Sequence, residues 1–185
     1  MIVIVAGVSG SGKTTVGELL AARLSWPFID GDSLHPKANV AKMARGIPLT
    51  DADRMPWLRA IGAWIDGQLV LGQPGIVACS ALKRNYRDEL LDHRPDVVIA
   101  FLLISASVVT DRLAARHGHF FDADLLGSQF AALEQPGPRE DRVLPVPVTA
   151  TASPADLADL IIAKLGLAVL ARGEDPPDPP GWAES

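Results

Sequence analysis

The sequence lacks the features that mark secreted, membrane-spanning and nucleic-acid-binding proteins. It has one cysteine, Cys79, which excludes a disulfide within the chain, and no basic leader precedes its first apolar stretch. Its longest purely apolar run, Val97–Ile104, is far shorter than the ~20 residues that a membrane-spanning helix needs. Lysines and arginines are scattered and the net charge is −5, so no electrostatic footprint for nucleic acid or an anionic membrane is visible. We therefore expect a cytoplasmic protein with no membrane and no nucleic-acid partner.

Asparagine is also scarce, and this narrows the class of nucleotide-binding proteins. Asn39 and Asn85 are the only two, and neither is followed by lysine, so the chain lacks the N-K-x-D signature with which GTPases read guanine. It also lacks the long Arg- or Lys-rich surface of a nucleic-acid motor. Both absences disfavour a GTP-driven switch and a motor protein.

What the chain does have is the pattern of an α/β fold. Its 185 residues, 48% of them hydrophobic, are enough for one compact core, and we expect a single domain over 1–168. Short apolar runs alternate with longer amphipathic ones, as in βαβ units that feed a parallel sheet flanked by helices. Five strands are expected: Ile2–Ala6, a short one at Phe28 and Ile29, Ile76–Cys79, Val97–Ile104 and Val143–Val148. The last contains Pro145 and Pro147, which cannot donate to a strand ladder, so we expect this strand either to lie at a sheet edge or to be shorter than the run.

Capping residues mark several helix boundaries. The first helix should run from Lys13 to about Leu24, with its apolar residues on one face. Thr50–Asp53 and Ser153–Asp156 both read as capping boxes, and the second has proline at the first helical position. The end of the chain, 171–185, is rich in Pro, Asp and Glu and poor in apolar residues, so we expect a disordered tail there.

A phosphate-binding loop follows the first strand. The octet "GVSGSGKT", Gly7–Thr14, satisfies G-x-x-x-x-G-K-S/T between a strand and a helix, which is the context that the motif requires. Main-chain amides and the helix N-terminus should hold phosphate oxygens, with Lys13 reaching the β- and γ-phosphates and the Thr14 hydroxyl on Mg²⁺. The residues expected to contact the nucleotide are Gly7, Ser9, Gly10, Ser11, Gly12, Lys13, Thr14 and Thr15.

Two carboxylates come at the end of the second strand. Asp30 and Asp32 lie where ligands of open α/β sheets bind, and their spacing puts both side chains on one side if the backbone stays extended. One of them can hold Mg²⁺ through water, and the other can orient or deprotonate an attacking hydroxyl. The alternative is a plain turn, because Asp-Gly-Asp-Ser is ordinary turn chemistry.

Basic residues follow the third strand. Lys83 and Arg84 should project into the same cleft, with Arg87 one turn further along the next helix. There they can bind phosphate, substrate or neighbouring acids. The alternative is that they form a solvated first turn of that helix.

A second basic segment follows the fourth strand and its helix. Arg112 and Arg116 are four residues apart on one helical face, and the chain then breaks at Gly118. In a phosphoryl-transfer enzyme this is the place for a mobile lid, over about 112–125, that brings positive charge onto the β/γ bridge and excludes water. The alternative is an exposed basic helix end that complements the helix dipole.

Taken together, these segments resemble the gluconate kinase (gluconokinase) family. The resemblance covers roughly residues 2–165 and rests on five segments in the family's order and spacing: "GVSGSGKT", "FIDGDSLHPKANVAKMARGIPLTDADRMPWL", "CSALKRNYRD", "RLAARHGHFF" and "QFAALEQP". It implies transfer of the ATP γ-phosphate to the 6-hydroxyl of D-gluconate, with Mg²⁺, on a P-loop NTPase fold like that of the nucleoside monophosphate kinases. It also implies a homodimer.

The resemblance assigns roles to individual residues. Asp30 and Asp32 resemble the Asp-x-Asp of the related shikimate kinases, where the first carboxylate serves Mg²⁺ and the second the substrate hydroxyl. Arg112 matches the family's lid and should contact the nucleotide. The residues implied to act in the chemistry are Lys13, Asp32 and Arg116. The residues implied to line the sugar-acid side, besides Asp32, are His35, Lys37, Arg54, Lys83, Arg87 and His119.

Two other functions stay open at this point. One is a kinase for another small hydroxy acid such as shikimate, and the other is a catalytically silent nucleotide-binding sensor. The proline-rich fifth strand departs from the family pattern and leaves the adenine contacts near Val146–Ala150 undefined.

Overall fold

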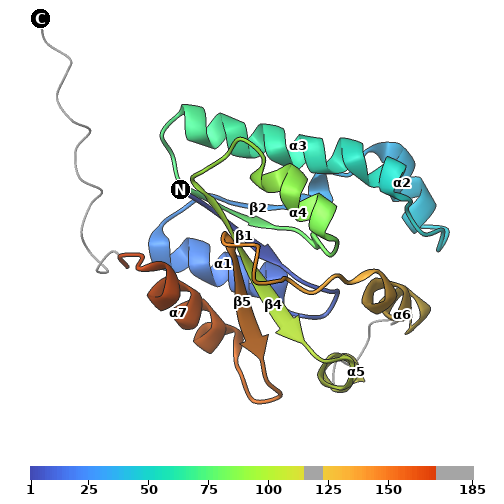
Figure 1. The fold of residues 1–185 in the computed structure, drawn as a ribbon. Coiled ribbons are helices and arrows are strands. Elements are labelled where there is room, and N and C mark those ends of the chain that lie inside the picture. Colours follow the sequence, from blue (N-terminus) through green and yellow to red (C-terminus); the bar gives the residue numbers. More distant parts are fainter. Residues whose placement is uncertain (115–122, 170–185) are drawn as a thin grey trace, which may run out of the picture.

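A parallel sheet organises the chain. The structure is a computed structural model that describes residues 1–114 and 123–169, with the backbone alone for 111–114 and 123–125. Its strands are β1 (Ile2–Ala6), β2 (Phe28–Asp30), β3 (Gly75–Ala78), β4 (Val97–Ile104) and β5 (Val143–Val148). All pairs are parallel and the order is β2-β3-β1-β4-β5 (Figure 1). The predicted five-stranded parallel sheet is confirmed.

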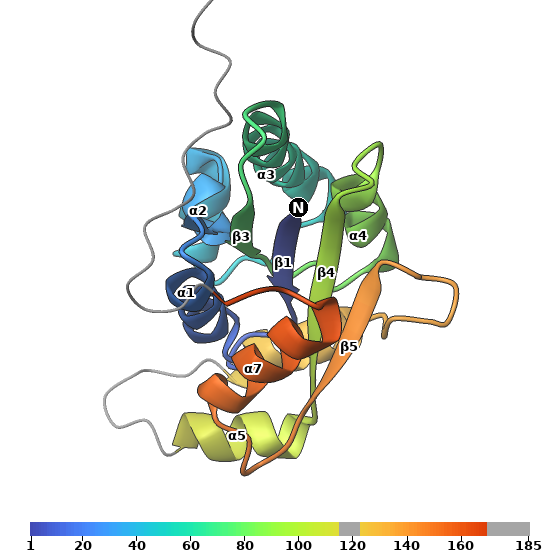
Figure 2. The same cartoon turned by 90° about the vertical axis from the view of Figure 1, so that its left-hand side faces the viewer.

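The strand bounds follow the apolar runs closely. β1, β4 and β5 have the predicted bounds, whereas β3 is shifted by one residue and ends before Cys79. β5 pairs only with β4 in the sheet and therefore lies at its edge, which is one of the two arrangements that the prolines predicted (Figure 2). Pro145 and Pro147 are both exposed there, so their missing amide hydrogens leave no buried partner unsatisfied.

Helices cover both faces of the sheet. They are α1 (Lys13–Leu24), α2 (Lys37–Met43), α3 (Asp51–Val70), α4 (Arg84–Leu91), α5 (Ala106–Ala114), α6 (Ala123–Ala132) and α7 (Pro154–Leu165). α1 and α7 pack together on one face, and α3 and α4 lie on the other (Figure 1). Both predicted capping boxes are present, at the starts of α3 and α7.

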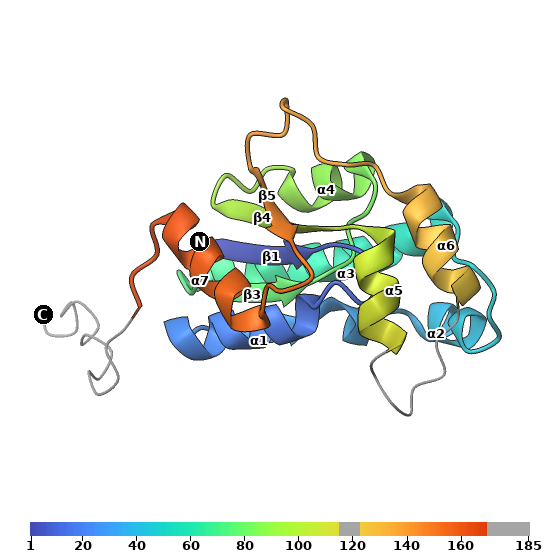
Figure 3. The same cartoon turned by 90° about the horizontal axis from the view of Figure 1, so that it is seen from below.

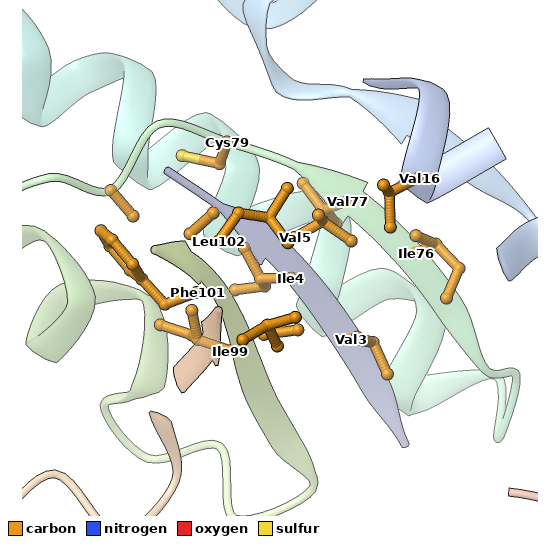
Figure 4. Close-up of a cluster of buried hydrophobic side chains, with 14 of the residues drawn as sticks. Val3, Ile4, Val5, Val16, Ile76, Val77, Cys79, Ile99, Phe101 and Leu102 are labelled. Carbon is orange, nitrogen blue, oxygen red and sulfur yellow. The ribbon is translucent and has the colours of Figure 1, made fainter. Parts of the chain in front are cut away.

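The core lies on the central strands. Every residue of β1 is buried, and Figure 4 shows β1 side chains such as Ile4 and Val5 among those of the neighbouring strands, including Phe101. Because helices cover both faces, these strands read as continuous apolar runs rather than alternating ones. Cys79 belongs to this core, and burial raises the pKa of its thiol to about 12, so it is no nucleophile.

The fold gathers the polar motifs at one end. The parallel strands all point toward the end where α2, α5 and α6 lie (Figure 3). Most of the predicted lid, with Arg116 and His119, and the tail 171–185 fall outside the described residues. Arg112 lies in α5, where only the backbone is described. Among the described helices, none is long and apolar enough to cross a membrane.

Candidate active site at the nucleotide loop

The segment between β1 and α1 has the shape of a phosphate cradle. Gly7, Gly10 and Gly12 have φ angles of 140°, 76° and 99°, in the region that favours glycine. A Cβ atom on Gly7 would lie 2.9 Å from the Leu102 carbonyl oxygen, so no larger residue fits there. α1 begins directly after Gly12, and its free amides and dipole favour an anion at this point.

Lys13 lies at the mouth of the loop with its charge unneutralised. Its Nζ donates a hydrogen bond to the Val8 carbonyl oxygen at 3.1 Å, and no described carboxylate is within ion-pair distance of it. Burial lowers the pKa of this lysine, while the negative charges of Asp32 and Asp30 oppose that shift. The ammonium group makes no structural ion pair with a described residue, so its charge is available for a phosphate.

The serine side chains of the loop are used differently. Ser11 is fully buried, and its Oγ has no hydrogen-bond partner among the described residues. Since this hydroxyl faces Gly7 beneath the loop, a ligand would meet Ser11 through its main chain. The amide of Ser9 donates to Gln129 Oε1 at 2.6 Å. Thr15 is exposed on the first turn of α1.

The two residues predicted for Mg²⁺ come together. Thr14 Oγ1 donates to Asp30 Oδ2 at 3.0 Å, across the start of α1 and the end of β2. The described residues contain no cluster of three or more metal-ligating acids, histidines or cysteines. This donor set fits Mg²⁺, which is commonly held by one or two protein oxygens and completed by water and phosphate oxygens.

The Asp30–Asp32 segment is a turn as well as a site. β2 ends at Asp30, and Gly31–Leu34 forms a short 3-10 helix that Asp30 caps, with its Oδ1 accepting the Asp32 amide at 3.0 Å. The backbone is therefore not extended across the pair, and the condition for both side chains to share one strand face is not met. Gly31 allows the turn to pack against β3, because a Cβ there would lie 2.6 Å from the Ala78 carbonyl oxygen.

Asp32 and His35 are neighbours in the turn after β2, but Asp32 is exposed and His35 is buried. The Asp32 side chain is 73% exposed and the His35 side chain 4%, with 3.9 Å between Asp32 Oδ1 and His35 Nε2. The His35 ring stacks on Trp57, with centroids 4.3 Å apart, and Trp57 in turn donates to the Gly31 carbonyl oxygen at 2.7 Å. Burial lowers the pKa of His35, against the opposing effect of Asp32, so the ring favours its neutral form.

Lys83 is already paired, whereas Arg54 is not. Lys83 Nζ donates to both Asp51 oxygens at 2.7 and 3.0 Å, and Tyr86 adds a hydrogen bond to Asp51 at 2.6 Å. The Lys83 hydrogen bond, followed by that of Tyr86, lowers the pKa of Asp51. Arg54 lies close enough for its charge to lower the pKa of His35, yet its half-buried guanidinium has no hydrogen bond to any described side chain or carbonyl. Of these two cations, Arg54 is therefore the one whose charge is free to bind an anionic group.

The sequence assignment of Arg87 to the substrate is wrong. The Arg87 side chain is 0% exposed, and its Nε and Nη2 donate to the two carboxylate oxygens of Glu140 at 2.6 and 2.9 Å. Its Nη1 donates to carbonyl oxygens of Leu82 and Glu134, both at 3.0 Å, and the guanidinium lies 5.4 Å from the centre of the Phe101 ring. Arg87 is a buried brace beneath the basic segment, because its charge is satisfied inside the protein.

The other basic residues stay accessible. Lys37 is exposed on the first turn of α2, and Arg84 is exposed at the start of α4, where its nearest carboxylate is that of Asp88 on the same helix. This exposed position is the one that the solvated-turn alternative describes for Arg84. Its amide is capped by Glu134 Oε2 at 2.8 Å, a contact between residues 50 positions apart.

Sequence reasoning missed residues that act through distant contacts. Asp51, Glu134 and Glu140 pair with the basic segment, and Gln129 contacts the nucleotide loop. No local signal distinguishes these residues from exposed polar ones. The family resemblance offers a hint for three of them, because Asp51 falls within "FIDGDSLHPKANVAKMARGIPLTDADRMPWL" and Gln129 and Glu134 fall within "QFAALEQP".

Comparison with known proteins finds relatives over most of the chain. The shikimate kinase family model matches residues 9–118. The chain is 52% identical over 139 residues to a gluconokinase of Gluconobacter oxydans, covering 74% of this chain and 77% of that protein. It is 42% identical over 147 residues to the thermoresistant gluconokinase of Escherichia coli, covering 80% and 84%. A solved gluconokinase structure from Sinorhizobium meliloti superposes with a TM-score of 0.78 at 44% identity, covering 89% of this chain and 90% of the other. This chain belongs to the gluconokinase family.

Proposed function

We propose that the protein is a kinase that uses ATP to phosphorylate D-gluconate on its 6-hydroxyl, giving 6-phospho-D-gluconate. One observation carries the proposal: a complete phosphate loop with an unneutralised Lys13 stands at the same sheet end as Asp32 and Arg54, in a member of the gluconokinase family. The loop suits the triphosphate, and the carboxylate and guanidinium suit a hydroxy acid.

The nucleotide half supplies electrostatics. Loop amides and the start of α1 hold phosphate oxygens, and Lys13 balances charge on the β- and γ-phosphates. Thr14 and Asp30 would hold Mg²⁺, which neutralises phosphate charge when bound. Arg112 and Arg116 would add positive charge from the lid side, as the resemblance implies.

The acceptor half positions the hydroxyl. The oxygen of the 6-hydroxyl attacks the γ-phosphorus, its proton passes to Asp32, and the bond from phosphorus to the bridging oxygen breaks as ADP leaves. Neutral His35 favours hydrogen bonding to a hydroxyl over binding the carboxylate. Arg54 offers a planar fork for the carboxylate, and the family resemblance adds Lys37, Lys83 and His119.

The alternatives from the sequence are less well supported. A shikimate-like acceptor has the family model in its favour, but the curated relatives at 42–52% identity are named gluconokinases. A silent sensor would have no need of Asp30, Asp32 and Lys13 in one corner. The homodimer is a further proposal from the family resemblance, and the cytoplasmic location is one from the composition of the sequence. Sedimentation of the purified chain tests the first.

An ADP-release assay tests the proposed reaction. The purified protein with Mg-ATP is given D-gluconate, shikimate, other sugar acids or no acceptor. We expect ADP in proportion to D-gluconate and a background rate with the rest. If ADP is released but no acid accelerates the release, the loop still binds the nucleotide, and the proposed kinase activity is wrong.

A further inference from the structure

A glutamine of α6 contacts the nucleotide loop from outside it. Gln129 Oε1 accepts the amide of Ser9 at 2.6 Å, although 120 positions separate them in the sequence. This amide belongs to the same peptide unit as the Val8 carbonyl, which accepts hydrogen bonds from Lys13 Nζ at 3.1 Å and from the Ser11 amide at 3.2 Å. One planar peptide is thus held by α6 at its N–H and by Lys13 at its C=O.

This arrangement controls where the carbonyl points. The N–H and C=O of a trans peptide lie in one plane and point in opposite directions, so a fixed N–H fixes the carbonyl. A hydrogen bond accepted from the N–H also polarises the peptide and makes its carbonyl a stronger acceptor. The unit needs such a restraint, because Gly7 and Gly10 flank Val8 and Ser9, and glycines rotate at little steric cost.

We propose that Gln129 is a positioning residue for nucleoside triphosphate binding. It holds the Val8–Ser9 peptide so that the Val8 carbonyl keeps Lys13 at the mouth of the loop before the triphosphate arrives. Gln129 acts through this peptide and not by touching the nucleotide. The inference rests on the proposed function, because it takes the loop to be the ATP site.

A purely structural role makes different predictions. If Gln129 only tied α6 to the loop, its loss would lower thermal stability and weaken both ligands together. If it pre-organises Lys13, its loss weakens the triphosphate, because part of the binding free energy is then spent on ordering the loop. Affinity for D-gluconate and the melting temperature should change little.

The test uses the full chain with three variants. Gln129→Met keeps the length of the side chain and removes the acceptor, whereas Gln129→Glu keeps an acceptor. Gln73→Met is the matched control, because Gln73 is exposed just beyond α3 and its side chain has no hydrogen bond to another described residue. The readouts are the calorimetric Kd of a non-hydrolysable Mg-ATP analogue without gluconate, the Kd of D-gluconate, the melting temperature and the amide NMR signal of Ser9.

We expect Gln129→Met to shift the Ser9 signal and to raise the Kd of the analogue about tenfold, which corresponds to one lost hydrogen bond. Gln129→Glu should keep the Ser9 amide hydrogen-bonded, with its signal at or downfield of the wild-type position, and Gln73→Met should resemble the wild type. An analogue Kd within about twofold of wild type for Gln129→Met would overturn the inference, as would equal weakening of both ligands. If the wild-type protein binds the analogue but does not phosphorylate D-gluconate, the proposed function alone is overturned, because the binding assay contains no acceptor.

Discussion

The two halves of the site are built from different kinds of contact. The nucleotide half uses main-chain geometry within Gly7–Thr14, to which the end of β2 adds the Asp30 carboxylate and α6 adds the Gln129 contact. The acceptor half uses side-chain pairs between separate elements, such as Lys83 with Asp51 at 32 positions and Arg87 with Glu140 at 53. A local motif encodes most of the first kind, although Asp30 and Gln129 reach the loop from outside it, whereas the second exists only once the chain has folded.

The difference also appears in how positive charge is held. Lys13 and Arg54 have no described carboxylate partner, while Lys83 and Arg87 each have one. Unpaired cations in a cleft are ready for an anionic ligand, and paired ones contribute chiefly to the frame around it. This division predicts which substitutions will affect ligands and which will affect folding.

The largest effect should come from Asp32, at the boundary of the halves. Asp32→Asn should lower turnover on the order of a thousandfold with little change in the KM of D-gluconate, because the general base is lost. Asp30→Asn is the matched control and should instead raise the Mg²⁺ concentration needed for half-maximal activity. Steady-state kinetics over a range of Mg²⁺ concentrations measure both. Equal losses in the two variants, confined to binding, would contradict the division of roles.

Arg87 tests the claim that a paired cation belongs to the frame. Arg87→Met leaves the Glu140 carboxylate, whose side chain is 6% exposed, without its partner, so the free energy of unfolding should fall by about 3 kcal/mol. The double variant Arg87→Met, Glu140→Gln should recover part of that loss. Urea unfolding measures the change. A stable Arg87→Met protein with a raised KM for D-gluconate would restore the substrate role that the geometry denies.

Arg54 and Lys83 compare an unpaired with a paired cation in the same half. Arg54→Gln should raise the KM of D-gluconate tenfold or somewhat more, roughly the worth of a charge-assisted hydrogen bond. Lys83→Ala should raise it only about threefold, because Asp51 already holds the ammonium, and should leave the KM of ATP unchanged. Arg59→Gln, on the exposed face of α3 with a 71% exposed side chain, is the control. Calorimetry that finds unchanged gluconate affinity in Lys83→Ala would remove Lys83 from the substrate contacts.

The same comparison explains what the sequence could and could not predict. The strands, the loop and both capping boxes depend on residues a few positions apart, and the structure has them as expected. Asp30 and Thr14 meet because β2 ends and α1 begins at the same end of the sheet, which the βαβ pattern already implies. Arg87 looked like Lys83 in the sequence, because burial by Glu140 and Phe101 depends on the folded arrangement and leaves no local mark. Gln129 escaped notice for the same reason.

The smallest effect tests a case where local and distant contacts meet. Asp53 closes the capping box of α3 with Thr50 and also accepts a hydrogen bond from Lys42 Nζ at 2.6 Å. The Lys42 contact, followed by those with Thr50, lowers the pKa of Asp53 from 3.8 to about 2. Since the folded-state pKa lies below the unfolded one, the stability that this carboxylate contributes is complete above about pH 4 and is lost as the pH falls toward 2.

Asp156 in the capping box of α7 provides the matched control, because it has the same bonds to Ser153 and no lysine in hydrogen-bond contact. At neutral pH, Asp53→Asn should lower the melting temperature by about 3 °C and Asp156→Asn by less. The deficit of Asp53→Asn should shrink as the pH falls from about 4 toward 2, where the wild-type carboxyl is half protonated, and vanish below that. Calorimetric melting across this pH range measures both variants. If the two variants lose the same amount of melting temperature, the capping box alone stabilises the start of the helix. The contact with Lys42 then adds no stability to the acceptor half.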